Sequence, residues 1–159
     1  MAGVDISWKS PVFSEVVWRQ AVTTHATNFV HKDRNKSLSD YQAIRQELGA
    51  AKVLVETLRP WRVELAARLD ELWRAVKPQS EILISRTEFK VHAAEVANKV
   101  AAAALTVTGG YGYHQGPIER SFRDSRAAIA MGPSNVIARD WIGKALVGLP
   151  LELFYEEGE

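Results

Sequence analysis

The residues with the most unusual types and spacing lie in the stretch GGYGYHQGPIERSFRDSR, residues 109–126. Because glycine has no side chain, Gly109 and Gly110 allow a ligand or another backbone to come close, and they equally suit the end of a helix. In the same turn, His114 could act as a general acid or base near neutral pH, or could simply lie at the surface. Spacing alone leaves both interpretations of this turn open.

Arginine recurs at helical spacing within this stretch, at positions 120, 123 and 126, with Glu119 and Asp124 beside it. Charges three and four residues apart on a helix face one another. The pattern therefore predicts ion pairs within one helix on a solvated face.

Metal binding and nucleophilic catalysis have less support. Glu88, His92 and Glu95 lie on neighbouring turns of one predicted helix, but a carboxylate-bridged metal pair needs ligands from further helices. The other histidines, at 25, 31 and 114, are scattered. With no cysteine and no serine in a nucleophile-elbow pattern, we expect neither a metal site nor a covalent nucleophile.

The composition describes one ordinary water-soluble domain. The chain has 159 residues, of which 47% are hydrophobic and 25% charged, and its formal net charge is +1. Such a balance gives no general attraction to nucleic acid or anionic lipid. The longest weakly polar run, Val100 to Val107, is far too short for a membrane span, and Met1 to Lys9 lack the basic start and the apolar stretch of a signal peptide. We expect a cytoplasmic protein with no nucleic-acid or membrane partner.

Apolar periodicity predicts an all-α fold, an up-down four-helix bundle with an additional C-terminal helix. A long stripe that includes Leu65 marks the second helix, which we expect to bend at Pro60 and continue. Ser39 and Gln42 have the spacing of a capping box at its start. No strand is expected. The predicted helices cover about residues 11–30, 39–76, 79–106, 118–130 and 134–147.

The domain boundaries follow from the same pattern. Residues 1–10 form an N-terminal extension, residues 11–150 the helical bundle and residues 151–159 an acidic tail. The apolar positions of the first helix are mixed with polar residues, namely Thr23, Thr24, Thr27 and Asn28. Part of its surface is therefore expected to face something polar.

Several motifs resemble the C-terminal domain of the acyl-CoA dehydrogenase family. The likeness covers roughly residues 11–150 and is most specific between residues 109 and 134. It rests on Gly109-Gly110-Tyr111-Gly112-Tyr113, Pro117-Ile118-Glu119-Arg120, Arg123-Asp124, Met131-Gly132-Pro133-Ser134-Asn135 and Asp40-Tyr41-Gln42.

The resemblance implies a helical bundle at the core of a homo-oligomer, a dimer or tetramer, with FAD shared with a partner chain. Carried over by position, Gly109 and Gly110 approach the dinucleotide, Gln42 assists from the second helix, and Ser134 replaces a flavin-contacting threonine. Glycine amides and a helix start both suit a phosphate-bearing cofactor.

The sequence also departs from the family. Thr106 stands where the family has a glutamine, and Gly132 stands where it has the catalytic glutamate, so no catalytic residue is assigned. Some relatives place this base on the first helix of the C-terminal domain instead, and Asp5 and Glu15 are the carboxylates nearest to that position. The family's N-terminal helical domain and its middle β-domain have no counterpart in the chain.

Three hypotheses follow from the resemblance. The chain is a subunit or stand-alone C-terminal domain of an acyl-CoA dehydrogenase-like flavoprotein that oxidises an acyl thioester, with a partner chain carrying the flavin-binding β-domain. Alternatively, it is a non-catalytic assembly module derived from that family, or a truncated fragment of a longer dehydrogenase. Flavin binding only with a partner favours the first hypothesis, and a defined oligomer without flavin favours the second.

Overall fold

The computed structural model of the protein describes residues 18–151. The predicted extension 1–10, the start of the first helix and all of the acidic tail except Leu151 lie outside the described residues. Asp5 and Glu15 lie outside them as well.

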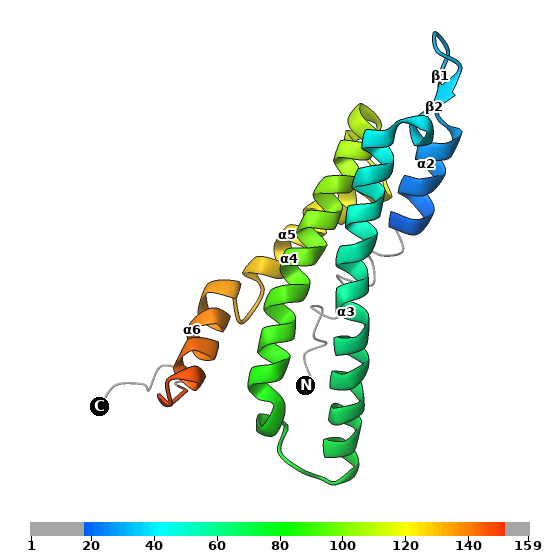
Figure 1. Cartoon of the computed structure of the whole chain (residues 1–159). Coiled ribbons are helices and arrows are strands. Elements are labelled where there is room, and N and C mark those ends of the chain that lie inside the picture. Colours follow the sequence, from blue (N-terminus) through cyan, green and yellow to red (C-terminus); the bar gives the residue numbers. More distant parts are fainter. Residues whose placement is uncertain (1–17, 152–159) are drawn as a thin grey trace.

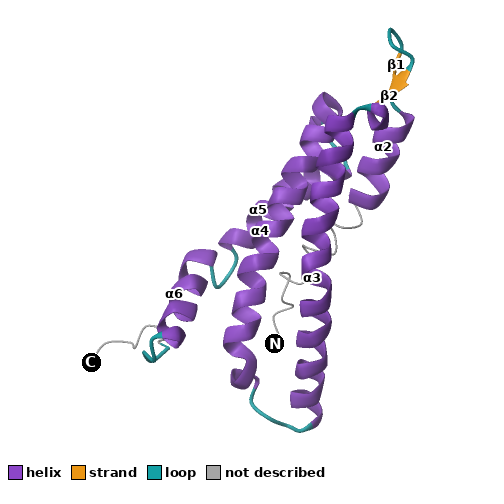
Figure 2. Ribbon diagram, viewed as in Figure 1, coloured by secondary structure: helices purple, strands orange, loops and turns teal. Residues whose placement is uncertain are grey.

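The described part of the chain is built almost entirely of helices, as Figure 2 shows. A short π-helical turn, η2 (Trp18–Val22), leads into the first α-helix, and three 3₁₀ segments connect later elements. The α-helices are α2 (Thr23–Asn28), α3 (Gln42–Arg74), α4 (Leu83–Thr108), α5 (Pro117–Ala130) and α6 (Asn135–Leu146). The 3₁₀ segments are η3 (Leu38–Asp40), η4 (Gln79–Ile82) and η5 (Gly109–Tyr113). The predicted all-α class is confirmed.

The two long helices, α3 and α4, run antiparallel and form the body of the bundle (Figure 1). Short α2 lies at the end where α3 begins and α4 finishes. From that end α5 returns along the second half of α4, and α6 continues toward the other end, diverging from the bundle. Gly109–Gly110 and the start of α3 therefore share one end of the molecule, while α6 points away from it.

Helix α4 is the centre of the packing because it contacts α3, α5 and α6. Its alanines are small enough to let these neighbours approach, and Ala93, Ala97, Val100 and Ala104 are all buried. A helix that is covered on several sides needs apolar residues around most of its circumference. Among the described helices, none is long and apolar enough to cross a membrane.

The predicted stripe of α3 forms the other half of the core. Ala51, Leu58, Leu65 and Leu72 are buried at successive steps of seven residues, which keeps them on one face of the helix. The helix continues across Pro60, as predicted.

Two local expectations about the segment between α2 and α3 were wrong. Strands β1 (Val30–His31) and β2 (Lys36–Ser37) form a short antiparallel hairpin where no strand was expected. Two-residue strands are too short to leave a periodic pattern in the sequence. The capping box also lies earlier than predicted: Ser37 and Asp40 form it around η3, because the side chain of Asp40 accepts from the backbone amide of Ser37 at 2.7 Å.

Candidate functional site

The glycine-rich turn combines a helix end with an open backbone. Gly109 ends α4 with φ 54° and ψ −139°, a conformation that side-chain-bearing residues rarely adopt. Gly112 is buried, and a Cβ at this position would collide with Oγ1 of Thr108. Both residues are therefore glycine for reasons internal to the fold.

Gly110 has no such internal reason. It is exposed, its φ lies outside the left-handed region, and a Cβ built on it would meet no atom within 4 Å. Gly109 also faces open space. The turn is therefore not sealed beneath its own side chains, and its backbone is accessible to another molecule.

Of the other two predicted flavin contacts, Gln42 lies at the same end of the bundle as this turn and Ser134 does not. Gln42 is the exposed first residue of α3 and lies at the same end of the bundle (Figure 1). Ser134 lies beside Pro133, whose carbonyl accepts from Lys90, nineteen positions before Gly109. At the rise of an α-helix, that separation is about 28 Å along α4. One small ligand could not contact both places.

Ser134 is the N-cap of α6, and its hydroxyl accepts from the amide of Ile137 at 3.5 Å. Beside it, Lys90 holds the α5–α6 connection against α4. The ammonium of Lys90 donates to the carbonyl of Pro133 and to Oδ1 of Asn135, both at 2.7 Å. Asn135 is only 2% exposed, so its hydrogen bond with Lys90 is well shielded from water.

The positions where the family carries functional side chains offer little chemistry here. Gly132 is exposed, and the space around it is open, but it has no side chain to abstract a proton. Thr106 is exposed and donates its hydroxyl to the carbonyl of Ala102, within its own helix, at 3.2 Å. Neither residue extends as far as the glutamate or the glutamine that the resemblance implies at its position.

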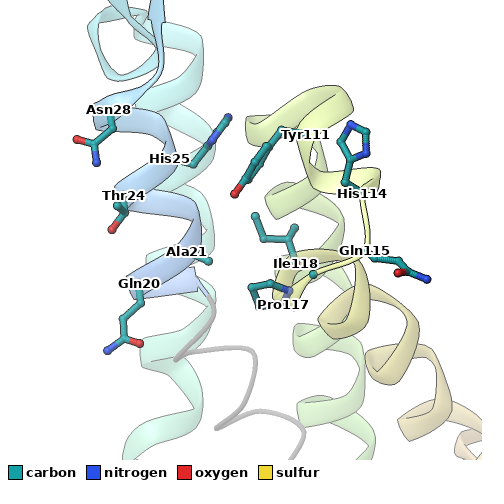
Figure 3. Close-up of a pocket in the computed structure, with 11 residues that line it drawn as sticks. Gln20, Ala21, Thr24, His25, Asn28, Tyr111, His114, Gln115, Pro117 and Ile118 are labelled. Atoms are coloured by element: carbon teal, nitrogen blue, oxygen red, sulfur yellow. The ribbon is translucent and has the colours of Figure 1, made fainter.

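A cavity of about 390 Å³ lies between α2 and the segment from η5 to the start of α5 (Figure 3). Ala21, Pro117 and Ile118 give it an apolar wall, and Thr24 and Asn28 line it from α2. The predicted polar surface of the first helix therefore lines this cavity.

The imidazole of His25 and the ring of Tyr111 close the cavity on one side, as Figure 3 shows. The two rings are parallel within 8°, and their centroids are 4.1 Å apart. Burial lowers the pKa of His25, because the charged imidazolium is poorly solvated there. Further ring contacts of His25 with Phe29, and of His31 with Phe29 and Tyr41, connect this stack to the start of α3.

The arginines of α5 have three different environments. Arg123 forms the predicted intrahelical ion pair with Glu119, at 3.2 Å. The guanidinium of Arg126 lies over the ring of Phe122, 5.8 Å from its centroid. Arg120 is exposed and has no ion-pair partner within residues 18–151. It lines a recess of about 370 Å³ that adjoins the cavity.

Two of the three candidate metal ligands, His92 and Glu95, take part in contacts between helices. Nε2 of His92 lies 3.4 Å from Oγ1 of Thr57 on α3, and Glu95 forms an ion pair with Arg139 on α6. Within the described residues, no group of three or more histidine, aspartate or glutamate side chains could hold a metal ion.

Comparison with known proteins identifies the family. Residues 15–147 match the family model described as "Acyl-CoA dehydrogenase, C-terminal domain", which is most of the chain. The chain belongs to the acyl-CoA dehydrogenase family and corresponds to its C-terminal domain.

The chain aligns with only part of each of two curated relatives. Cyclohexane-1-carbonyl-CoA dehydrogenase of Geobacter metallireducens is 29% identical over 117 residues, which are 73% of this chain and 29% of that protein. Subunit CarC of the caffeyl-CoA reductase-Etf complex of Acetobacterium woodii is 30% identical over 107 residues, 66% of this chain and 26% of that protein. The chain thus spans less than a third of the length of either relative.

Solved structures support the fold. The glutaryl-coenzyme A dehydrogenase glutaryl-CoA complex superposes with a TM-score of 0.76 at 21% identity, covering 91% of this chain and 34% of that chain. Butyryl-CoA dehydrogenase from Megasphaera elsdenii gives a TM-score of 0.74 at 22% identity, covering 89% and 35%. At these identities the likeness establishes the helical fold.

Proposed function

We propose that the chain is one subunit of an acyl-CoA dehydrogenase-like flavoprotein that oxidises an acyl-CoA or a related acyl thioester. A partner chain supplies the flavin-binding β-domain, and this chain completes the FAD site and the oligomer. FAD, when bound, supplies the oxidation chemistry. Gly109, Gly110 and Gln42 hold its dinucleotide end, and Ser134 approaches the cofactor from α6.

The exposure of Gly110 and the open space around it are the observation that carries this proposal. Gly109 is required by its positive φ and Gly112 by its burial, but nothing within residues 18–151 requires a glycine at position 110. An exposed glycine with free space around it lets a backbone amide meet a phosphate that comes from outside. The exposed carboxamide of Gln42 at the same end of the bundle adds a neutral hydrogen-bonding group.

The distance of Ser134 from this turn supports a cofactor that is shared between chains. The two places lie about 28 Å apart along α4, so an extended dinucleotide or two different cofactors are needed to reach both. Gly132 has no side chain to act as the base, so the group that removes the substrate proton comes from elsewhere, either from the partner chain or from Asp5 or Glu15 of this chain.

The proposal is tested by producing the chain alone and together with a chain that carries the missing helical and β-domains. We expect the two chains to copurify with the visible absorption bands of a flavin, and the chain alone to lack them. Light scattering during size-exclusion chromatography reports the mass of each species. A defined oligomer that never acquires flavin would instead support the assembly module.

A matched pair of variants separates cofactor contact from folding. Gly110→Leu places a side chain where the fold has open space, so the helical content stays unchanged while flavin content falls. Gly49→Leu is the control, because Gly49 is also exposed and a Cβ added to it would meet no atom within 4 Å, but it lies on α3 outside the site. Equal flavin content in both variants contradicts the proposed contact at Gly110.

A further inference from the structure

The cavity between α2 and η5 is not explained by the proposed flavin contacts. Its volume of about 390 Å³ falls within the range of small-molecule sites. Neither the two glycines of the turn, nor Gln42, nor Ser134 lines it. The proposed flavin contacts therefore leave this cavity open to a different ligand.

The described residues that line the cavity include two histidines, His25 and His114, but no permanently charged side chain. Apolar side chains of Ala21, Pro117 and Ile118 lie beside neutral hydrogen-bonding groups such as Gln20 and Thr24, and within residues 18–151 no lysine, arginine or carboxylate lines the cavity. Burial lowers the pKa of His25, so this ring is neutral at neutral pH. A charged group would gain no permanent counter-charge from these side chains. The cavity therefore suits an uncharged group with a polar edge and apolar faces.

A basic recess adjoins the cavity. Gln115 and Gly116 line both spaces, which makes them neighbours, and the recess has a volume of about 370 Å³. Glu119 in its wall is already paired with Arg123. The guanidinium of Arg120 has no ion pair within the described part of the chain and is available to an anion. Guanidinium groups match the geometry of phosphate oxygens well.

We propose that the cavity and the recess together bind a nucleoside monophosphate, with the base beside Ala21 and Ile118 and the phosphate at Arg120. A nucleobase is a neutral planar ring with hydrogen-bonding edges, and the sugar joins it to a phosphate at short range. This combination matches an uncharged cavity that opens onto an arginine. Figure 3 shows the hydroxyl end of Tyr111 directed into the gap between α2 and Ile118, where it can meet the edge of such a ring.

Neither half of the site is sufficient alone. A single exposed arginine holds inorganic phosphate weakly, because water and salt screen the charge. Adenosine gains the contacts of the cavity but leaves Arg120 without a partner. Affinity should therefore increase from inorganic phosphate to adenosine to adenosine monophosphate (AMP).

Isothermal titration of the full chain with AMP, adenosine and inorganic phosphate tests this order. Arg120→Gln should weaken AMP binding about tenfold and leave adenosine binding unchanged, since one charge-assisted hydrogen-bonded contact is lost. Arg74→Gln is the matched control: it removes the same charge from an exposed position at the far end of α3 and should leave both affinities unchanged. Ala21→Leu fills the cavity and should weaken AMP and adenosine alike.

Should Ala21→Leu disturb folding, as circular dichroism would show, Thr24→Trp blocks the cavity from a position of α2 that lines it. No saturable binding of AMP overturns the inference. Equal affinities for AMP and adenosine, or equal losses in Arg120→Gln and Arg74→Gln, also overturn it. The site does not depend on the proposed flavin contacts, because a chain that binds AMP and never acquires flavin keeps this inference while the flavoprotein proposal fails.

Discussion

The imidazole of His25 lies flat against the ring of Tyr111, with the centroids 4.1 Å apart, and this stack ties α2 to the glycine-rich turn. The two residues are far apart in the sequence, so the contact is tertiary. Tyr111 directly follows Gly110, and the position of the turn therefore depends on a side chain of the first helix. Burial disfavours the charged form of His25, which makes the stack sensitive to pH.

The pH dependence of stability should reveal His25. Its folded pKa lies below the ordinary value of 6.5, so the unfolded chain takes up this proton more readily than the folded chain. The contribution of His25 to the free energy of unfolding is therefore complete above pH 6.5 and decreases as the pH falls toward the lowered folded pKa. His25→Phe keeps a ring at this position and removes the titration.

Urea unfolding of both proteins above and below pH 6.5 measures this difference. The wild-type chain should lose more stability on acidification than His25→Phe. Histidines 31, 92 and 114 are present in both proteins, so their contributions cancel in the comparison. Identical pH profiles would show that the stack does not disfavour the imidazolium.

Two glycines of the same turn should respond differently to alanine. In Gly112→Ala the new Cβ collides with Oγ1 of Thr108, which already donates to the carbonyl of Ala104 at 2.7 Å. We expect a loss of about 1–3 kcal/mol in the free energy of unfolding, typical of overpacking. Gly110→Ala should change it by less than about 0.5 kcal/mol, because that Cβ meets nothing. Denaturant unfolding measures both, and similar losses would mean that Gly110 is needed by the fold itself.

The helices could be predicted because their signals are local. The alternation of three and four along α3 and the alanines of α4 identify the faces that pack together, and Gly109 marks the end of α4. The predicted boundaries of α5 and α6 agree with the structure within one or two residues. Such patterns lie within one element and need no knowledge of its neighbours.

The tertiary contacts could not be predicted in this way. The polar positions of the first helix indicated a polar environment, but nothing in their spacing identified the turn around Tyr111 as the opposite wall. Lys90 and Asn135 likewise form their contact between separate helices. Pairing across elements depends on the packed fold, and a single sequence carries no signal for it.

Lys90 should stabilise the attachment of α6 to α4. Lys90→Met retains the apolar stem and removes the donor to Pro133 and Asn135, leaving the buried Oδ1 of Asn135 without this bond. An unsatisfied buried acceptor costs about 1–3 kcal/mol. Hydrogen exchange should therefore accelerate in α6 more than in α3. Lys99→Met, at an exposed position of the same helix, is the control. Uniform acceleration across the molecule would mean that α6 does not open separately.

Leu65 should be among the most sensitive positions of the core. It is 1% exposed and lies in the middle of the buried stripe of α3, where the sequence predicts a core residue. Leu65→Ala removes most of its packing against α4 and leaves a cavity, so we expect a loss of about 2–5 kcal/mol in the free energy of unfolding. Val63→Ala, on the same helix at 61% exposure, should lose less than about 0.5 kcal/mol. If urea unfolding gives equal losses for the two variants, the outer face of α3 is also covered in solution, for example by a second copy of the chain. A concentration-dependent midpoint for the wild-type chain would then accompany that result, because association stabilises the folded state by mass action.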